Sequence, residues 1–288
     1  MKRFIILFTL IILGISSIIF VCLKDNNKNN PNLQSVVDLG GDIARNFHRV
    51  GMTLSRVKSS EEITLGKKLA QDLEQRVRLF NCPERQDYVQ KVGNKVAEGR
   101  KRKDISYRFQ IIDSGQENAF ALPGGYIYIT TRMLAFLQSE AELAFILGHE
   151  IAHVDQHHAI EQYQYQMNLE KIGLDDLEKI ITGLQYLSAL SYSEQQEHEA
   201  DFQGIRLMAL ANYKPQSSVE IFERMKAIEE DTVQKAKPNI AKDPIEETAD
   251  VLEGAIKSYF ETHPSFERRI YEMERYIQST GIKSLGRI

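Results

Sequence analysis

Residues Leu147–His158 read LGHEIAHVDQHH and contain four of the seven histidines in this 288-residue chain. Within them, His149, Glu150 and His153 form an HExxH pattern. Residues four apart lie on one face of a helix, so both imidazoles can reach the same ion while the glutamate points aside. This geometry suits a zinc site in which Glu150 takes a proton from a water that the metal has made acidic.

The residues before the motif predict that it lies on a buried helix. Ala141–Gly148 reads AELAFILG and is strongly apolar, and Ser139 followed by Glu142 has the pattern of a capping box. We therefore expect a helix that begins near Ser139 and continues to about Gln162. Two histidines and a glutamate on a buried helix need a partner, and a metal ion supplies one.

A tetrahedral catalytic zinc site needs a third protein ligand. His157 and His158 are poor candidates, because ligands on three successive turns would strain one helix against one ion. The elongated HExxHxxGxxH pattern is also absent, since Gln156 and Ala159 replace its glycine and its third histidine. We expect His157 and His158 either on the helix surface or orienting other groups.

A downstream acidic segment offers better candidates for the third ligand. Glu197 and Asp201 share a helix face, and Gly204 lies on nearly the same face, where it would let this helix approach another closely. One carboxylate can bind zinc while another accepts a hydrogen bond from a ligand histidine. Spacing alone leaves three glutamates open as the ligand: Glu194, Glu197 and Glu199.

The rest of the chain predicts many helices and a small sheet, that is, one α+β domain. Residues 105–112 and 125–130 are rich in β-branched and aromatic residues and predict strands, and the LPGG sequence at 122–125 predicts a turn. Periodicity and capping patterns predict further helices at 61–79, 85–97, 175–190, from Ser193 to before Pro215, and after Thr262–Ile270. The charged residues 231–250 contain two prolines and predict a mobile excursion.

The N-terminus predicts a membrane anchor. Residues 4–23 carry no charge, and twenty helical residues span about 30 Å, the thickness of a bilayer core. The preceding Lys2–Arg3 pair favours a cytoplasmic N-terminus with the rest of the chain translocated. A cleaved signal peptide or lipidation at Cys22 is the alternative, although Val21 stands where a small residue is typical. The net charge of −4 indicates no nucleic-acid partner.

Four segments, taken in order, resemble one zinc metallopeptidase family: NAFALPGGYIYIT at 118–130, EAELAFILGHEIAHVDQHH at 140–158, EHEAD at 197–201 and THPSFERRI at 262–270. This is metallopeptidase family forty-eight, of the gluzincin type, which includes the CAAX-prenyl endoproteases, HtpX, the Oma-type proteases and the BepA-type periplasmic proteases. The resemblance covers about Glu61 to Ile270. It implies that Glu197 is the third zinc ligand and that Asp201 orients a ligand histidine.

The same resemblance implies roles for residues outside the metal motif. The segment of Asn118, Ala119, Phe120 and Ala121 is similar to an edge strand that pairs with an extended substrate through main-chain hydrogen bonds. His263 and Arg269 would approach the zinc from the C-terminal side, where either could stabilise the oxyanion. His263 could instead fill the open position of the zinc and hold the enzyme inactive.

Together these observations predict a gluzincin-type α+β metalloprotease domain at 61–288, after a signal-anchor or signal peptide at 1–23 and a linker at 24–60. We expect one Zn²⁺ per chain. The resemblance implies cleavage of misfolded or unassembled envelope proteins, and we expect this in the bacterial periplasm, with the chain held in the inner membrane through residues 4–23. One alternative is a catalytically silent, chaperone-like binder of unfolded chains that uses the edge strand. Another is a zinc hydrolase that acts on a non-peptide bond.

Overall fold

The computed structural model describes residues 57–171, 192–235, 263 and 266–283. The expected anchor at 4–23, most of the linker at 24–60, the expected helix at 175–190 and residues 236–250 lie outside this range and stay predictions. Among the helices that are described, none combines the length and the apolar character that a membrane crossing requires.

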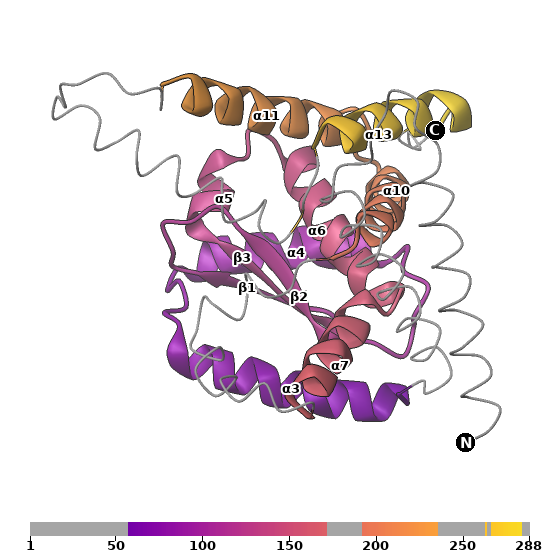
Figure 1. The fold of residues 1–288 in the computed structure, drawn as a ribbon. Coiled ribbons are helices and arrows are strands. Elements are labelled where there is room, and N and C mark those ends of the chain that lie inside the picture. The colour runs from indigo at the N-terminus through magenta and orange to yellow at the C-terminus, as the bar shows by residue number, and fades with distance from the viewer. Residues whose placement is uncertain (1–56, 172–191, 236–262, 264–265, 284–288) are drawn as a thin grey trace, which may run out of the picture. The chain divides into compact units, whose positions relative to one another are not determined.

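A mixed sheet of three strands lies at the centre of the described domain (Figure 1). It is built from β1 (Arg108–Ile112), β2 (Ala119–Leu122) and β3 (Tyr126–Thr130) in the order β1-β3-β2, with β1 parallel and β2 antiparallel to β3. The strands expected at 105–112 and 125–130 are confirmed, the first with a later start. The expected turn is the 3-10 segment η1 (Pro123–Gly125), where Gly124 and Gly125 have φ of 76° and 93°.

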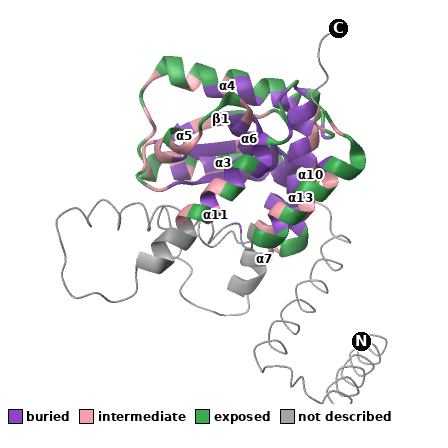
Figure 2. Cartoon of the chain, turned by 90° about the horizontal axis from the view of Figure 1, so that it is seen from above, coloured by how far each residue is buried: buried purple, intermediate pink, exposed green. Residues whose placement is uncertain are grey.

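The strand side chains alternate between two apolar clusters, one on each face of the sheet. On one face, Ile127 and Ile129 pack with α4 (Pro83–Ala97) and α6 (Glu140–Asp155) in the main core. On the other, Phe120 and Tyr128 pack with Ala70 and Leu73 of α3 (Ser59–Arg76). Burial is therefore concentrated in the sheet and in α6 (Figure 2).

Helix α6 carries the HExxH motif and begins as expected, with the Ser139 side chain accepting from the backbone N of Glu142 at 3.2 Å. The reciprocal half of the capping box is absent, because the Glu142 carboxylate accepts from the backbone N of Gln138 and from Arg224. From Glu142 to Asp155 every residue of the helix is buried, which confirms the expected burial.

The expected continuation of this helix to Gln162 is wrong. Helix α6 ends at Asp155, His157 takes the left-handed conformation with φ 67°, and α7 (His158–Lys171) begins at the next residue. The end of α6 is fixed by the Asp155 carboxylate, which accepts from the backbone N of Lys101 at 2.7 Å and of Arg102 at 3.2 Å. Tertiary contacts therefore end the helix at Asp155, and the break changes the direction in which His158 points.

Helix α10 (Glu194–Leu210) lies against α6 and begins with the expected capping box at Ser193 and Gln196. The two helices touch where glycines meet: a Cβ on Gly204 would lie 3.0 Å from the backbone N of His149, and one on Gly148 would lie 3.1 Å from the carbonyl O of Gly204. The expected close approach at Gly204 is thus confirmed.

Three more helices complete the described domain: α5 (Thr131–Phe136), α11 (Ser217–Lys235) and α13 (Phe266–Thr280). Helices α11 and α13 pack against each other (Figure 1). Helix α13 confirms the last expected helix, but it begins at Phe266, earlier than the expected start after Ile270. The sequence reading missed α5 and α11. It was wrong in assigning residues 231–235 to a mobile excursion, because they continue α11.

Candidate metal centre

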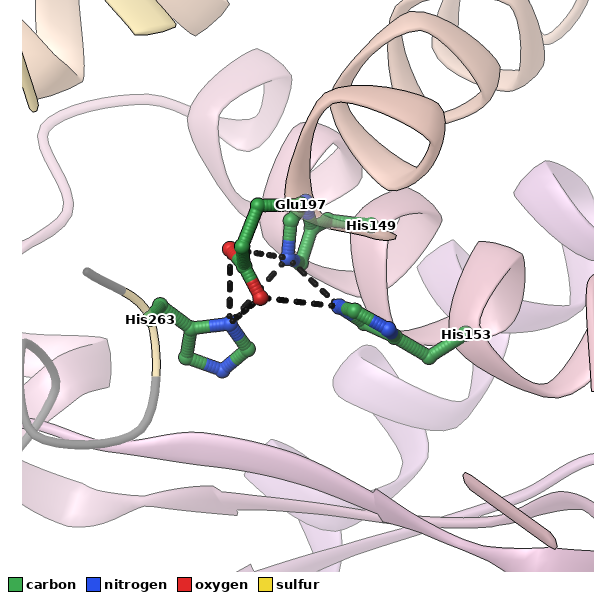
Figure 3. Close-up of side chains that lie close together, drawn as sticks. All are labelled: His149, His153, Glu197 and His263. Atoms are coloured by element: carbon green, nitrogen blue, oxygen red, sulfur yellow. Dashed lines mark hydrogen bonds and ion pairs between the residues drawn. The ribbon is translucent and has the colours of Figure 1, made fainter. Parts of the chain in front are cut away.

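Four buried side chains from three parts of the chain converge on one point (Figure 3). His149 and His153 come from α6, Glu197 from α10 and His263 from just before α13. Each offers one ligand atom, and these atoms all lie within 4.8 Å of one another. The Nε2 atoms of His149 and His153 are 3.0 Å apart, and each lies 3.6 Å from an oxygen of Glu197.

The donor set fits a zinc ion. Imidazole nitrogens and a carboxylate oxygen are ordinary zinc ligands, and four of them suit its tetrahedral preference. Burial lowers the pKa of His153 well below its usual range, with contributions from His149 and His158, so this imidazole stays neutral as a ligand must. Burial opposes the charge on Glu197, but His263 and Arg269 outweigh that effect and lower the pKa of Glu197. A buried, ionised carboxylate beside imidazole nitrogens is an environment that attracts a cation.

Glu150 follows His149 on α6 and points into the same buried region. Neither of its carboxylate oxygens has a hydrogen-bond partner among the described residues, and Oε1 lies 3.6 Å from Nε2 of His263. Burial raises the pKa of Glu150, and the neighbouring His263 and His149 offset this only in part. An unsatisfied buried carboxylate with a raised pKa is suited to accepting a proton from water.

Asp201 and Arg269 contact the metal-binding side chains on the side away from the metal position. Oδ1 of Asp201 lies 3.0 Å from Nδ1 of His149, the nitrogen turned away from the metal position. Arg269 is fully buried and donates to both oxygens of Asp201 at 2.7 Å, while its Nη1 lies 2.6 Å from Oε2 of Glu197. Burial opposes ionisation of Asp201, yet Arg269 outweighs it and lowers the pKa of Asp201 below its usual range.

His263 lies among the ligand atoms. Its Nδ1 is 2.9 Å from Oε1 of Glu197 and 3.3 Å from Nε2 of His149. Burial disfavours the charged imidazole, but Glu197 and Glu150 outweigh it and raise the pKa of His263. His263 thus lies within the group of side chains that could hold a metal, and its role as an oxyanion donor or as a fourth ligand stays a prediction.

The segment expected to pair with substrate forms β2, together with Asn118 before it. In the described sheet β2 pairs with β3 alone, so it is an edge strand, and it packs against α6. Residues 118–121 are all buried. The location of the strand agrees with the expectation, whereas pairing with a peptide stays a prediction.

Three further residues lie in this part of the domain. The sequence left His157 and His158 open between the helix surface and orienting other groups, and it assigned no role to Tyr192. The ring of Tyr192 stacks on His153 with centroids 3.7 Å apart, and no sequence pattern pointed to it. His158 is almost fully buried: its Nδ1 lies 3.1 Å from Nδ1 of His153, and its Nε2 lies 3.2 Å from Oε2 of Glu199. His157 faces away and contacts Arg102 at 3.2 Å.

Comparison with known proteins identifies the domain. A family described as Peptidase family M48 matches residues 83–277, which is more than half of the chain. The chain is 26% identical over 205 residues to the mitochondrial metalloendopeptidase OMA1 of Schizosaccharomyces pombe, covering 68% of this chain and 54% of that protein. It is 24% identical over 193 residues to the β-barrel assembly-enhancing protease of Yersinia pestis, covering 61% of this chain and 39% of that protein. The chain thus spans about half or less of the length of these relatives.

Proposed function

The chain belongs to peptidase family M48 and carries a buried cluster of metal-binding residues, and from this premise we propose that it is a zinc-dependent metalloendopeptidase. One Zn²⁺ would be held by His149, His153 and Glu197. The single observation that carries the proposal is that two nitrogens and a carboxylate from different helices converge around one point. Beside it lies the carboxylate of Glu150, which accepts no hydrogen bond from the described residues.

Each protein group would have a separate task in peptide hydrolysis. When bound, zinc supplies a Lewis acid that polarises the scissile carbonyl and acidifies a water. Glu150 would accept a proton from that water and deliver it to the leaving nitrogen. Asp201 would hold the imidazole of His149 in place, and Arg269 would keep Asp201 and Glu197 ionised and oriented. The resemblance made Arg269 one of two candidates to stabilise the oxyanion, whereas its contacts with Asp201 and Glu197 support this positioning role.

The proposed substrates are unfolded or extended polypeptides. Within the described sheet β2 is an edge strand, and it packs on the helix that carries the metal ligands. An edge strand can pair with extended backbone through main-chain hydrogen bonds, with little regard to side chains. We extend the proposal to misfolded or unassembled envelope proteins. The relative from Yersinia pestis, whose name refers to β-barrel assembly, supports that extension.

We also propose that the protease domain faces the bacterial periplasm and is held at the inner membrane by residues 4–23. Support comes from the uncharged run of twenty residues and the basic pair before it. Release by cleavage, or lipidation at Cys22, is the alternative fate of the same segment.

Metal removal and replacement tests the proposed activity. The purified full-length chain in mild detergent should cleave casein, lose cleavage when a chelator removes its zinc, and recover it when one equivalent of zinc is returned. Replacing Glu197 by Gln should prevent recovery, because the third ligand then lacks its charge. Cleavage that persists in metal-free protein would refute the proposal.

A second candidate function is a catalytically silent binder of unfolded chains. The observation that favours it is the location of His263, whose Nδ1 lies among the atoms that would hold the metal. In that case the zinc-loaded wild type would bind unfolded casein without cutting it. A His263→Ala variant that begins to cut would show that the site is an enzyme closed by its own histidine.

A further inference from the structure

The break between α6 and α7 gives His158 a position that a straight helix would deny it. Residues five apart on a continuous helix point about 140° away from each other. Here the left-handed conformation of His157 ends α6, and His158 turns back so that its Nδ1 lies 3.1 Å from Nδ1 of His153. The contact is buried on both sides.

This contact determines which nitrogen of each ring carries a hydrogen. His153 directs Nε2 toward Glu197 and His149, so Nε2 is the atom that offers a lone pair to a metal. Its Nδ1 must then carry the hydrogen of the neutral ring. For Nδ1 of His158 to accept that hydrogen, His158 must be protonated on Nε2. That nitrogen faces Oε2 of Glu199 at 3.2 Å, and a carboxylate can only accept.

We propose that His158 and Glu199 are positioning residues for the zinc ligand His153. The hydrogen-bond chain runs from Nδ1–H of His153 to His158, and from Nε2–H of His158 to Glu199. It is the counterpart on His153 of the contact that Asp201 makes with His149. These two hydrogen bonds fix the ring orientation and tautomer of His153 and make its Nε2 a stronger donor to the metal.

The two ends of this chain differ in their surroundings. His158 is buried and held by the helix break, whereas the Glu199 side chain is one third exposed and its other oxygen accepts from Gln195 at 2.9 Å. Glu199 can therefore be changed without opening the core. Because Glu199 lies on α10 and His158 begins α7, their contact also links the start of α7 to α10, the helix that carries Glu197.

The inference rests on the proposed zinc site. Measuring zinc affinity tests the zinc site through the wild type and the positioning role of His158 and Glu199 through the variants. Zinc dissociation constants would be measured by competition with a chromophoric chelator on the full-length chain, using wild type, His158→Phe, Glu199→Gln and the double variant. Glu194→Gln is the matched control, since Glu194 lies on the same helix and is 47% exposed. The thermal midpoint of each metal-free protein would report on folding.

His158→Phe should weaken zinc binding by about 10- to 100-fold, the usual cost of losing such an outer partner. Glu199→Gln should weaken it less, and the control should bind as wild type does. In the double variant, Glu199→Gln should add nothing further, because Glu199 acts through His158. Unchanged affinity in His158→Phe would overturn the inference, and so would an undiminished effect of Glu199→Gln in the double variant. A wild type that binds no zinc would instead refute the proposed function.

A spectroscopic measurement keeps the test valid if His158→Phe does not fold. In the zinc-loaded wild type with ¹⁵N-labelled histidine, His158 should show a protonated Nε2 and a bare Nδ1, with Nδ1 of His153 protonated. The opposite tautomer of His158 would overturn the inference, because its Nδ1 could not accept from His153.

Discussion

At the scale of single residues, Arg269 balances the charge behind the metal position. It is fully buried and contacts both Asp201 and Glu197, and its guanidinium also lies over the ring of Phe222 with 4.6 Å to the centroid. Without it, two carboxylates would remain buried with one cationic partner fewer. The ionised forms of both acids therefore depend on a residue far along the chain.

Replacing Arg269 by Met should lower the free energy of unfolding by about 3–5 kcal/mol, the usual cost of removing one partner from a buried ion pair. Urea unfolding of the metal-free protein would measure this. Arg268→Met is the control, because Arg268 is 60% exposed and its contacts with Glu194 and Glu272 lie at the surface. Equal losses in the two variants would contradict the role assigned to Arg269.

Local spacing was enough to predict His149, Glu150 and His153, because an HExxH pattern defines its own geometry on a helix. It left three glutamates open as the third ligand, and only the resemblance chose Glu197. The contact between Arg269 and Asp201 could not be predicted from spacing, since 68 positions separate the two residues. Pairings of that length depend on how helices pack.

At the scale of secondary-structure elements, the crossing of α6 and α10 sets the metal geometry. Gly148 and Gly204 remove the side chains that would hold the two helices apart, so Glu197 reaches the histidines of α6. The start of each helix was predictable from its capping residues. The end of α6 was not, because the sequence Asp155–His158 contains neither glycine nor proline to mark a break.

Gly204→Ala should destabilise the domain by about 1–3 kcal/mol, because the new methyl group would meet the backbone N of His149 at 3.0 Å and only a shift of a helix can relieve that contact. Zinc affinity should fall with it as Glu197 moves away. Gly115→Ala is the control, since a Cβ there has no neighbour within 4 Å. Thermal unfolding and zinc competition would measure both effects. Unchanged zinc affinity in Gly204→Ala would show that the crossing does not set the site.

At the scale of the whole molecule, the described domain extends beyond the family match at its N-terminal side. The match begins at residue 83, yet α3 packs on one face of the sheet. Glu62 of α3 accepts from Arg102 at 2.8 Å and from the backbone N of Gly124 at 3.1 Å, which ties the helix to the turn after β2. The α+β class and the small sheet were predictable from periodicity, but these long-range ties were not.

The central claim is that Glu150 is the proton acceptor of a zinc peptidase, and the initial rate of casein cleavage by Glu150→Gln, compared with wild type at equal zinc content, tests it most directly. Both proteins should bind one zinc, and the rate should fall by at least about 10²-fold in the variant, because general base catalysis usually contributes 10²–10⁴. Cleavage by the variant at the wild-type rate would contradict the claim. If neither zinc-loaded protein cuts casein, the result would contradict peptidase activity for the arrangement described here, in which His263 lies among the metal-binding atoms.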